Sequence, residues 1–118
     1  MPKEMLSKNF TRSEFACHCG CGFDAISQHV VDVVQAIRTG AGHPVRINSG
    51  CRCAKHNSAI GGVKNSDHKK GNAADISCTG LRYKKFRDIV LVVASRFEGV
   101  YLIPYDADKF CHIGWRKK

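Results

Sequence analysis

One short segment, SDHKKGNAADI at residues 66–76, places an imidazole and a carboxylate seven residues apart with a glycine between them. The part around Asp75 is small and apolar, which is typical of a buried strand. A carboxylate in such a strand needs a cation or a hydrogen-bond network, because burying an unpaired charge is costly. If the chain turns so that His68 and Asp75 meet, the pair suits a divalent cation.

A third ligand is needed for such a cation, and His112 near the C-terminus is the best candidate. Three protein ligands leave one coordination position open, which is the arrangement of a catalytic rather than a structural zinc. The sequence therefore predicts a Zn²⁺ site formed by His68, Asp75 and His112. Taken singly, each residue has a simpler interpretation: a surface histidine in a polar loop, a turn-capping aspartate and a half-buried strand histidine.

The length of 118 residues fits one domain, predicted to span residues 1–118 with an N-terminal extension at 1–8 and a basic tail at 116–118. No apolar run approaches the ~20 residues needed to cross a bilayer. The N-terminal residues lack the apolar centre of a secretory signal. We therefore expect a monomeric product that is synthesised in the cytoplasm without a signal peptide, whether or not it later leaves the cell.

The charge balance is strongly basic, with 19 Lys and Arg against 10 Asp and Glu and a net charge of +9. Such a surface favours anionic partners, among them nucleic acid, acidic lipid and anionic polymers of the bacterial cell wall. Charge alone does not choose among these partners. A basic surface that serves only solubility is the simplest alternative.

The chain contains seven cysteines, of which Cys17, Cys19 and Cys21 alternate in CHCGCG and Cys51 and Cys53 form a second cluster. Without a secretion signal they are interpreted as reduced thiols or metal ligands rather than as a disulfide framework. Zinc sites usually space paired cysteines by two to four residues, unlike the Cys-x-Cys spacing here. A second zinc built from both clusters is therefore less favoured than packing cysteines or one disulfide.

Hydrophobic periodicity predicts an α+β fold, in which helices pack on one small, mainly antiparallel sheet. Thr11 is expected to cap a short helical turn through residue 15, with Glu14 three residues later. His68 is expected on a polar loop at 63–72, and the second and third strands are expected to form a hairpin. The remaining elements are predicted as helices at 24–39, 53–60 and 81–97 and as strands at 45–48, 73–78, 99–103 and 110–115.

Three segments, SGCRCAKHN at 49–57, SDHKKGNAADI at 66–76 and FCHI at 110–113, resemble in order and spacing the zinc D-alanyl-D-alanine carboxypeptidase family. Its relatives include vancomycin-resistance D,D-dipeptidases and phage endolysins that cut L-alanyl-D-glutamate bonds. The segment NFTRSEFACHCGCG also resembles the start of small phage members, so the resemblance covers residues 9–116. It implies a fold like that of these peptidases and of the hedgehog signalling domain.

The resemblance implies that zinc is bound by His68, Asp75 and His112. Arg52 matches the arginine that holds a substrate carboxylate, a task for which the always-charged guanidinium fork is suited. Ser66 matches a position two residues before the first ligand, where it could hydrogen-bond the substrate or the site loop.

The chain departs from the family pattern in its acidic residues. Family members commonly place an acid three residues before the final histidine, where this chain has Lys109, and many have an aspartate where it has Gly114. Asp108 is the favoured proton acceptor, with Asp106 as the second choice. If neither reaches the site, the protein would bind zinc and ligand with little or no hydrolysis.

The leading hypothesis is a zinc metallopeptidase that cuts peptidoglycan peptides next to a D-residue, as a D-alanyl-D-alanine carboxypeptidase or an L-alanyl-D-glutamate endopeptidase. It would derive from a phage or prophage and act at the cell wall or in the periplasm, either in lysis or as part of the virion. The first alternative is an inactive, zinc-containing wall-binding module on the same fold. A nucleic-acid binder ranks last, because no aromatic stacking platform and no regular cysteine pairing is present.

Overall fold

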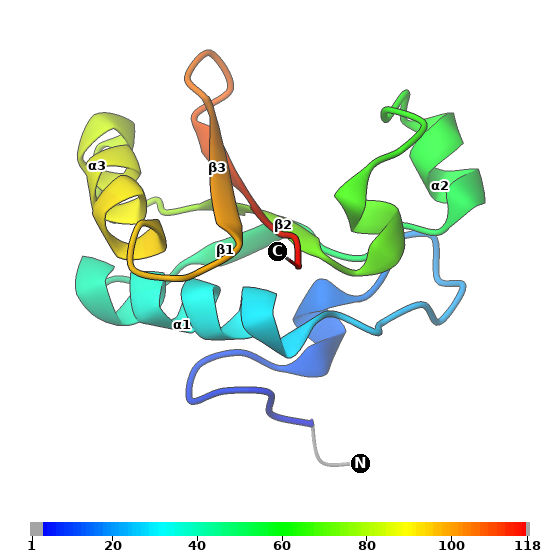
Figure 1. Cartoon of the computed structure of the whole chain (residues 1–118), viewed down its shortest axis with the longest axis horizontal. Helices are drawn as coiled ribbons and strands as arrows, with labels where there is room; N and C mark the ends of the chain where they lie inside the picture. The colour runs from blue at the N-terminus through cyan, green and yellow to red at the C-terminus, as the bar shows by residue number, and fades with distance from the viewer. Residues whose placement is uncertain (1–3, 118) are drawn as a thin grey trace.

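A four-stranded antiparallel sheet in the order β1–β2–β4–β3 forms the centre of the molecule (Figure 1). The computed structural model describes residues 4–117 of the chain. The strands are β1 (Arg46–Ser49), β2 (Ala73–Ser77), β3 (Val100–Tyr105) and β4 (Phe110–Trp115). Together with the helices that pack against it, this sheet confirms the predicted α+β class.

The two faces of the sheet have different roles because successive strand side chains point to opposite sides. Ala74 of β2 lies opposite Ile113 of β4, and both are fully buried in the hydrophobic core. The next pair along the same two strands is Asp75 opposite His112, which therefore faces away from that core. One face builds the core and the other carries the predicted metal ligands.

Helices α1 (Gln28–Ala41) and α3 (Tyr83–Ala94) cover the core face, while the short α2 (Ala54–Ala59) lies on the other side of the β3–β4 hairpin (Figure 1). The apolar stripe predicted for the first long helix is buried, as is that of α3. The largest fully buried side chains are Phe10, Phe15, Phe86, Ile37, Ile76, Ile113, Val30, Val31, Val33, Val34 and Val90.

The observed helices begin at other residues than predicted where a capping group sets the first residue. Helix α1 starts at residue 28 rather than 24, because Ser27 Oγ accepts a hydrogen bond from the amide of His29 at 3.2 Å. The predicted turn after Thr11 is the 3-10 helix η1 (Arg12–Phe15), where Glu14 accepts from the Thr11 amide at 2.9 Å.

His68 does not lie on an irregular loop but on a second 3-10 helix, η2 (Asp67–Lys70). Ser66 Oγ caps its start by accepting a hydrogen bond from the amide of His68, and Gly71 ends it with a left-handed backbone at φ 70°. The polar composition of the segment indicated a turn but not this local cap. Helix η2 therefore holds His68 at a defined distance from β2.

The predicted hairpin between the second and third strands is wrong, because β4 lies between β2 and β3. Strands β3 and β4 are joined by the tight turn at 106–109, so that β4 pairs with β3 along one edge and with β2 along the other. Strand β3 is an edge strand and can include Pro104, which has no amide to donate.

The predicted N-terminal extension is partly attached to the domain. Met5 forms a bridge with Thr11, and Ser7 Oγ donates to Gln35 Oε1 at 2.7 Å. Residues 1–3 of this extension, and residue 118 of the predicted basic tail, lie outside the described residues. Within 4–117, none of the helices has the length and apolar character that a bilayer crossing requires.

A first prediction concerns Gly71, which joins η2 to β2. Gly71 and Gly42 have nearly the same left-handed backbone, with φ 70° and 68°. An alanine Cβ at Gly42 would meet no atom within 4 Å, whereas at Gly71 it would overlap the backbone oxygen of Ala25. We expect Gly42→Ala to cost about 1 kcal/mol of unfolding free energy from backbone strain alone.

Gly71→Ala should cost about 1–3 kcal/mol more than Gly42→Ala, because the overlap with Ala25 is added to the same strain. Urea unfolding of the two variants measures this difference directly. Equal losses would contradict the close packing of Gly71 against the segment that precedes α1.

Candidate metal centre

The centre of the site is the pair formed by Asp75 and His112 on neighbouring strands. These residues lie directly opposite each other in β2 and β4, and His112 Nδ1 is 2.8 Å from Asp75 Oδ1. Both side chains are buried. The antiparallel register alone therefore brings together two ligands that lie 37 positions apart in the chain.

His68 completes the group from η2. Its Nε2 lies 3.2 Å from the same oxygen, Asp75 Oδ1, and its ring lies edge-on to that of His112 with centroids 5.0 Å apart. The donor atoms of His68, Asp75 and His112 all lie within 4.8 Å of one another. The structure thus brings together the three residues that the sequence predicts as metal ligands.

The donor set of this group fits a zinc ion. His68 Nδ1 is 2.7 Å from the carbonyl oxygen of Gly50, and because a carbonyl can only accept, this nitrogen carries the proton. The lone pair of His68 Nε2 is then free and faces Asp75 and His112. A hydrogen bond from the other ring nitrogen to a backbone carbonyl orients the histidine ligands of zinc sites, and two imidazoles with one carboxylate are typical zinc ligands.

A chain of polar side chains orients His112 in the same way. Its Nε2 lies 3.1 Å from the hydroxyl of Tyr101, which donates to the carboxylate of Asp67. Arg116 Nε donates to the same Asp67 oxygen at 2.9 Å. The Tyr101 oxygen can therefore accept from His112 Nε2, which leaves His112 Nδ1 as the nitrogen that faces Asp75.

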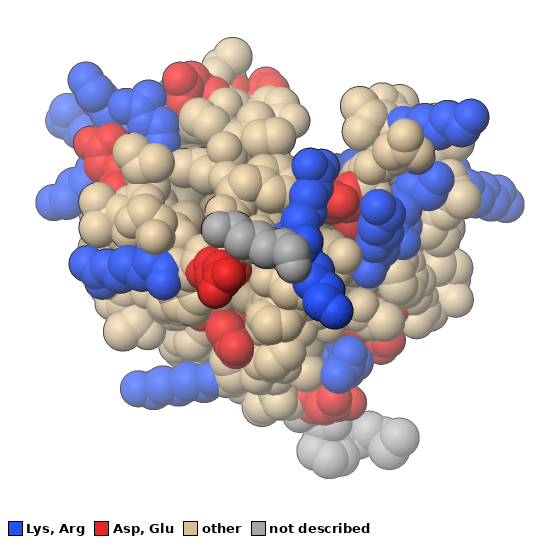
Figure 2. All heavy atoms as spheres, viewed as in Figure 1, with Lys and Arg blue, Asp and Glu red and all other residues tan. Residues whose placement is uncertain are grey.

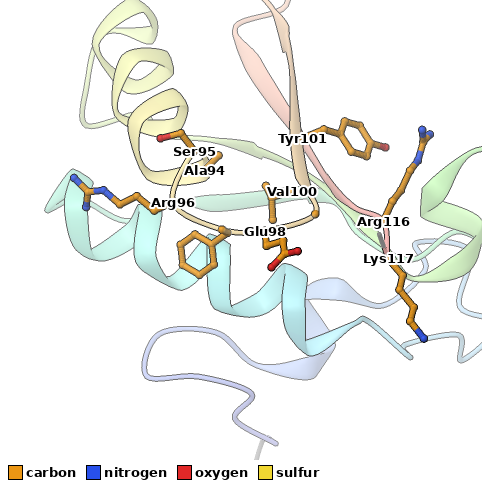
Figure 3. Close-up of a pocket in the computed structure, with 10 residues that line it drawn as sticks. Ala94, Ser95, Arg96, Glu98, Val100, Tyr101, Arg116 and Lys117 are labelled. Atoms are coloured by element: carbon orange, nitrogen blue, oxygen red, sulfur yellow. The ribbon is translucent and has the colours of Figure 1, made fainter.

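The sequence interpretation missed Tyr101, Asp67 and Arg116. Figure 3 shows Tyr101 and Arg116 extending to the same side of the sheet, where the Arg116 guanidinium lies 4.9 Å from the Tyr101 ring centroid. From the sequence, Arg116 is predicted to belong to a basic tail. The position of Asp67 next to His68 was the one signal in the sequence that could have indicated this group.

The metal-ligand group opens into a cavity of about 570 Å³. Figure 2 shows a hollow between the β3–β4 hairpin and the α2 side of the molecule, with Lys and Arg side chains along it. Besides the three histidine and aspartate ligands, Arg52, Ser66, Asp67 and the rings of Tyr105 and Phe110 line the cavity. A cavity of this size, lined by charged and polar side chains together with aromatic rings, suits a small molecule or a short peptide.

A larger hollow of about 710 Å³ lies beside it, where α3 connects to β3 (Figure 3). Tyr101 and Arg116 border both hollows. In the part of the chain that the structure describes, neither group of possible metal ligands includes a residue that lines this larger hollow. The smaller cavity is therefore the candidate site.

The charge states of the acidic groups follow from their surroundings. Burial acts to raise the pKa of Asp75, but the adjacent rings of His112 and His68 lower it to about 2. Burial likewise acts to raise the pKa of Asp67, and the hydrogen bonds from Tyr101 and Arg116 lower it below its ordinary value. Burial and the hydrogen bond to Asp67 raise the pKa of Tyr101. At neutral pH both aspartates are charged and Tyr101 is a hydroxyl donor.

Arg52 lies beside the ligands, as the sequence predicts. Its Nη2 is 3.2 Å from Asp75 Oδ2, its Nε donates to Ser49 Oγ at 3.0 Å, and its Nη1 donates to Asn57 Oδ1 at 3.3 Å. These contacts hold a mostly buried guanidinium at the cavity wall. The Ser66 hydroxyl also lines the cavity and accepts from the amide of His68.

The structure does not bring Asp108 or Asp106 to the ligand group. Asp108 is exposed in the β3–β4 turn and lines a separate hollow of about 600 Å³, together with Lys109 and residues of β1 and α3. Asp106 accepts from the hydroxyl of Tyr83 at 2.7 Å and from Arg87 at 3.4 Å. A role for Asp108 in proton transfer therefore stays a prediction, and Asp67 is the further carboxylate that lines the cavity.

The glycine at position 114 has a structural reason. Gly114 of β4 lies directly opposite Tyr101 of β3, and a Cβ at this glycine would overlap the Tyr101 ring. The Tyr101 ring lies over β4, in the space that a side chain at position 114 would occupy. The tyrosine that orients His112 thus takes the space that an aspartate at 114 would need.

A second prediction follows for Gly114→Ala. The added methyl group should displace the Tyr101 ring and lower the unfolding free energy by about 1–3 kcal/mol, as overpacking does elsewhere. In a Tyr101→Ala background, Gly114→Ala should lower the unfolding free energy by about 0.5 kcal/mol or less. A double-mutant cycle in urea measures the coupling, and an equal cost in both backgrounds would contradict the overlap.

Comparison with protein-family models matches residues 8–114 to the family described as Peptidase M15. A search of curated proteins found no match.

Proposed function

Because the chain belongs to the Peptidase M15 family, whose members are zinc-dependent peptidases, we propose that it hydrolyses peptide bonds of bacterial peptidoglycan. The observation that carries the proposal is the convergence of His68, Asp75 and His112 with Arg52 at one cavity. The bond would lie next to a D-residue, at a D-alanyl-D-alanine end or an L-alanyl-D-glutamate link. A phage or prophage origin and action at the cell wall belong to the same proposal.

His68, Asp75 and His112 would hold the zinc ion. When bound, zinc polarises a substrate carbonyl and lowers the pKa of a water molecule to about 7. Asp75 contributes the negative charge, since its pKa of about 2 keeps it ionised. The Gly50 carbonyl orients His68, and Tyr101 with Asp67 orients His112.

Arg52 is proposed to bind a carboxylate of the peptide. Its guanidinium lines the same cavity as the ligands and already lies 3.2 Å from a carboxylate oxygen, that of Asp75. Arginine can hold both oxygens of a carboxylate at once. The bound carboxylate would place the neighbouring peptide bond beside the ligand group, which is how positioning contributes to rate.

The charge of the molecule supports an anionic substrate. The net charge is +9, and Figure 2 shows Lys and Arg side chains along the hollow and over the α2 side. A positive surface raises the local concentration of anionic polymers and speeds their encounter. Wall peptides with free carboxylates, attached to anionic wall polymer, are substrates of this kind.

We retain Asp108 as the proposed proton acceptor. It is exposed at the tip of the β3–β4 hairpin, whereas Asp106 in the same turn is held by Tyr83 and Arg87. Because Asp108 lines the hollow on the α3 side, the proposal requires the hairpin tip to move toward the cavity when a peptide binds. Asp67 already lines the cavity, but its lowered pKa makes it a weak base.

The third prediction tests this role. Asp108→Asn should lower kcat by about 100-fold or more with unchanged zinc content, since general acid–base catalysis contributes about that much. Asp106→Asn, in the same turn, is the matched control and should keep nearly wild-type kcat. Full activity in Asp108→Asn together with its loss in Asp67→Asn would assign the role to the cavity carboxylate instead.

The fourth prediction tests the activity itself. Two synthetic wall peptides, one ending in D-alanyl-D-alanine and one with an internal L-alanyl-D-glutamate bond, should be incubated with the zinc-loaded protein. We expect new amino groups from one of them, and mass spectrometry of the products identifies the bond. His68→Ala should abolish the reaction, whereas His43→Ala, an exposed histidine outside the cavity, should not change it.

The second candidate function is a zinc-containing module that binds wall peptides without cleaving them. Lys109 at the usual acid position and the location of Asp108 in a separate hollow favour it. Zinc binding and retention on wall fragments without any new amino groups would select this function. If the protein binds neither zinc nor wall fragments, both candidate functions are contradicted.

A further inference from the structure

Four cysteines from two distant segments meet at the surface beside the Arg52 segment. Cys17, Cys19 and Cys21 come from the CHCGCG loop, and Cys53 follows Arg52 at the start of α2. Their sulfur atoms all lie within 4.8 Å of one another. None of these residues belongs to the His68 group.

The spacing of the sulfur atoms matches that of thiolates around a single metal ion. Cys17 Sγ lies 3.4 Å from Cys19 Sγ and 3.9 Å from Cys53 Sγ, and the Cys19 and Cys53 sulfurs are 3.5 Å apart. A tetrahedral zinc with Zn–S bonds of about 2.3 Å places its sulfurs about 3.8 Å apart. A disulfide would require about 2.05 Å.

Glycines explain how the Cys-x-Cys spacing can build such a group. Gly20 and Gly22 have left-handed backbones with φ 81° and 92°, and a Cβ at either would meet no atom within 4 Å. The amide of Gly20 donates to the Cys17 carbonyl at 3.3 Å, and the amide of Cys17 donates to the Phe23 carbonyl at 2.8 Å. The loop therefore curls on itself, and alternate cysteines turn toward one point.

The second segment is held against this loop by the backbone. The amide of Cys51 donates to the Phe15 carbonyl at 2.8 Å, and a Cβ at Gly50 would lie 2.6 Å from the same oxygen. This contact places Cys53 at the loop. Cys51 itself is 1% exposed and belongs to the hydrophobic core, so it is a packing cysteine, as favoured from the sequence, and not a member of the cluster.

Backbone amides point at the sulfur atoms. The amide of Cys53 donates to Cys17 Sγ at 3.5 Å, and the amide of His56 donates to Cys53 Sγ at 3.4 Å. Hydrogen bonds of this kind orient ligands and favour the charged form of a sulfur. A thiol needs no such donors, whereas a metal-bound thiolate is stabilised by them.

We propose that Cys17, Cys19, Cys21 and Cys53 bind a second, structural zinc ion. Four thiolates fill every position of a tetrahedral ion, so that this site has no place for a substrate. The ion would tie the CHCGCG loop to the segment that carries Arg52 and Gly50. Since the Gly50 carbonyl orients His68, the second ion would stabilise one wall of the candidate active site.

A disulfide accounts for the cluster less well. One disulfide would use two of the four sulfurs and leave two thiols beside it, while Cys19 and Cys21 are both exposed. Exposed paired thiols oxidise readily, and bound metal prevents this. The closed four-sulfur arrangement uses all four side chains.

The zinc content of the full chain, purified under reducing conditions, tests the proposal. We expect two zinc ions per chain in the wild type and one in Cys19→Ala/Cys21→Ala. Cys78→Ala is the matched control, because Cys78 is a buried cysteine outside the cluster, and it should keep two ions. His68→Ala should also lose one ion, but from the other site.

Cobalt separates the two sites by their ligands. Co²⁺ bound to thiolates gives intense sulfur-to-metal charge-transfer absorption, which a histidine and carboxylate site cannot give. This absorption should persist in His68→Ala and Cys78→Ala and disappear in Cys19→Ala/Cys21→Ala. Because it does not depend on peptide cleavage, the proposal can fail or succeed independently of the proposed peptidase activity.

A single conservative variant covers the case in which the double variant does not fold. Cys21→His should keep the second zinc, since three cysteines and one histidine also bind zinc, with a shifted cobalt spectrum. A wild-type chain that shows no thiolate absorption with Co²⁺, or a Cys19→Ala/Cys21→Ala chain that retains it, would overturn the proposal. A zinc-free chain with a Cys17–Cys19 or Cys17–Cys53 disulfide would do the same.

Discussion

The carboxylate of Asp75 is buried in the middle of the sheet, where it is stable only because the side chains around it match its charge. His112 contacts it across the strand pair, His68 from η2, and Arg52 from the segment after β1. Burial alone would raise its pKa, yet the contacts with His112 and His68 hold it at about 2. The site face of the sheet is thus arranged around one negative charge, and a zinc ion is the partner that this donor set fits.

The same face lacks acidic residues at positions 109 and 114, where the resemblance implied them. Lys109 and Gly114 stand there, and the space at Gly114 is filled by the ring of Tyr101. Tyr101 links His112 to Asp67, a carboxylate that comes from the other side of the ligand group. An acidic side chain next to the candidate ligands is therefore supplied by η2, through Asp67.

Much of the fold was predictable from periodicity. The apolar stripe of α1 is typical of a helix, and the alternation in residues 45–48, where Val45 and Ile47 are buried, is typical of a strand. Two of the three candidate metal ligands were predictable because histidine and aspartate at positions 68 and 75 flank a glycine turn. The pairing of β4 between β2 and β3 was not predictable in this way, since it depends on the length of the turn at 106–109 and on which strand edge remains free.

The amino-acid sequence by itself determined the local order of the chain and which three residues are candidate metal ligands, because side-chain period and residue chemistry are local properties. Only the tertiary structure decided which distant groups meet. It placed Cys53 rather than Cys51 with the CHCGCG cysteines, and Asp67 rather than Asp108 at the cavity. Each of these outcomes depends on contacts between segments tens of residues apart, which register, turn length and close backbone packing establish.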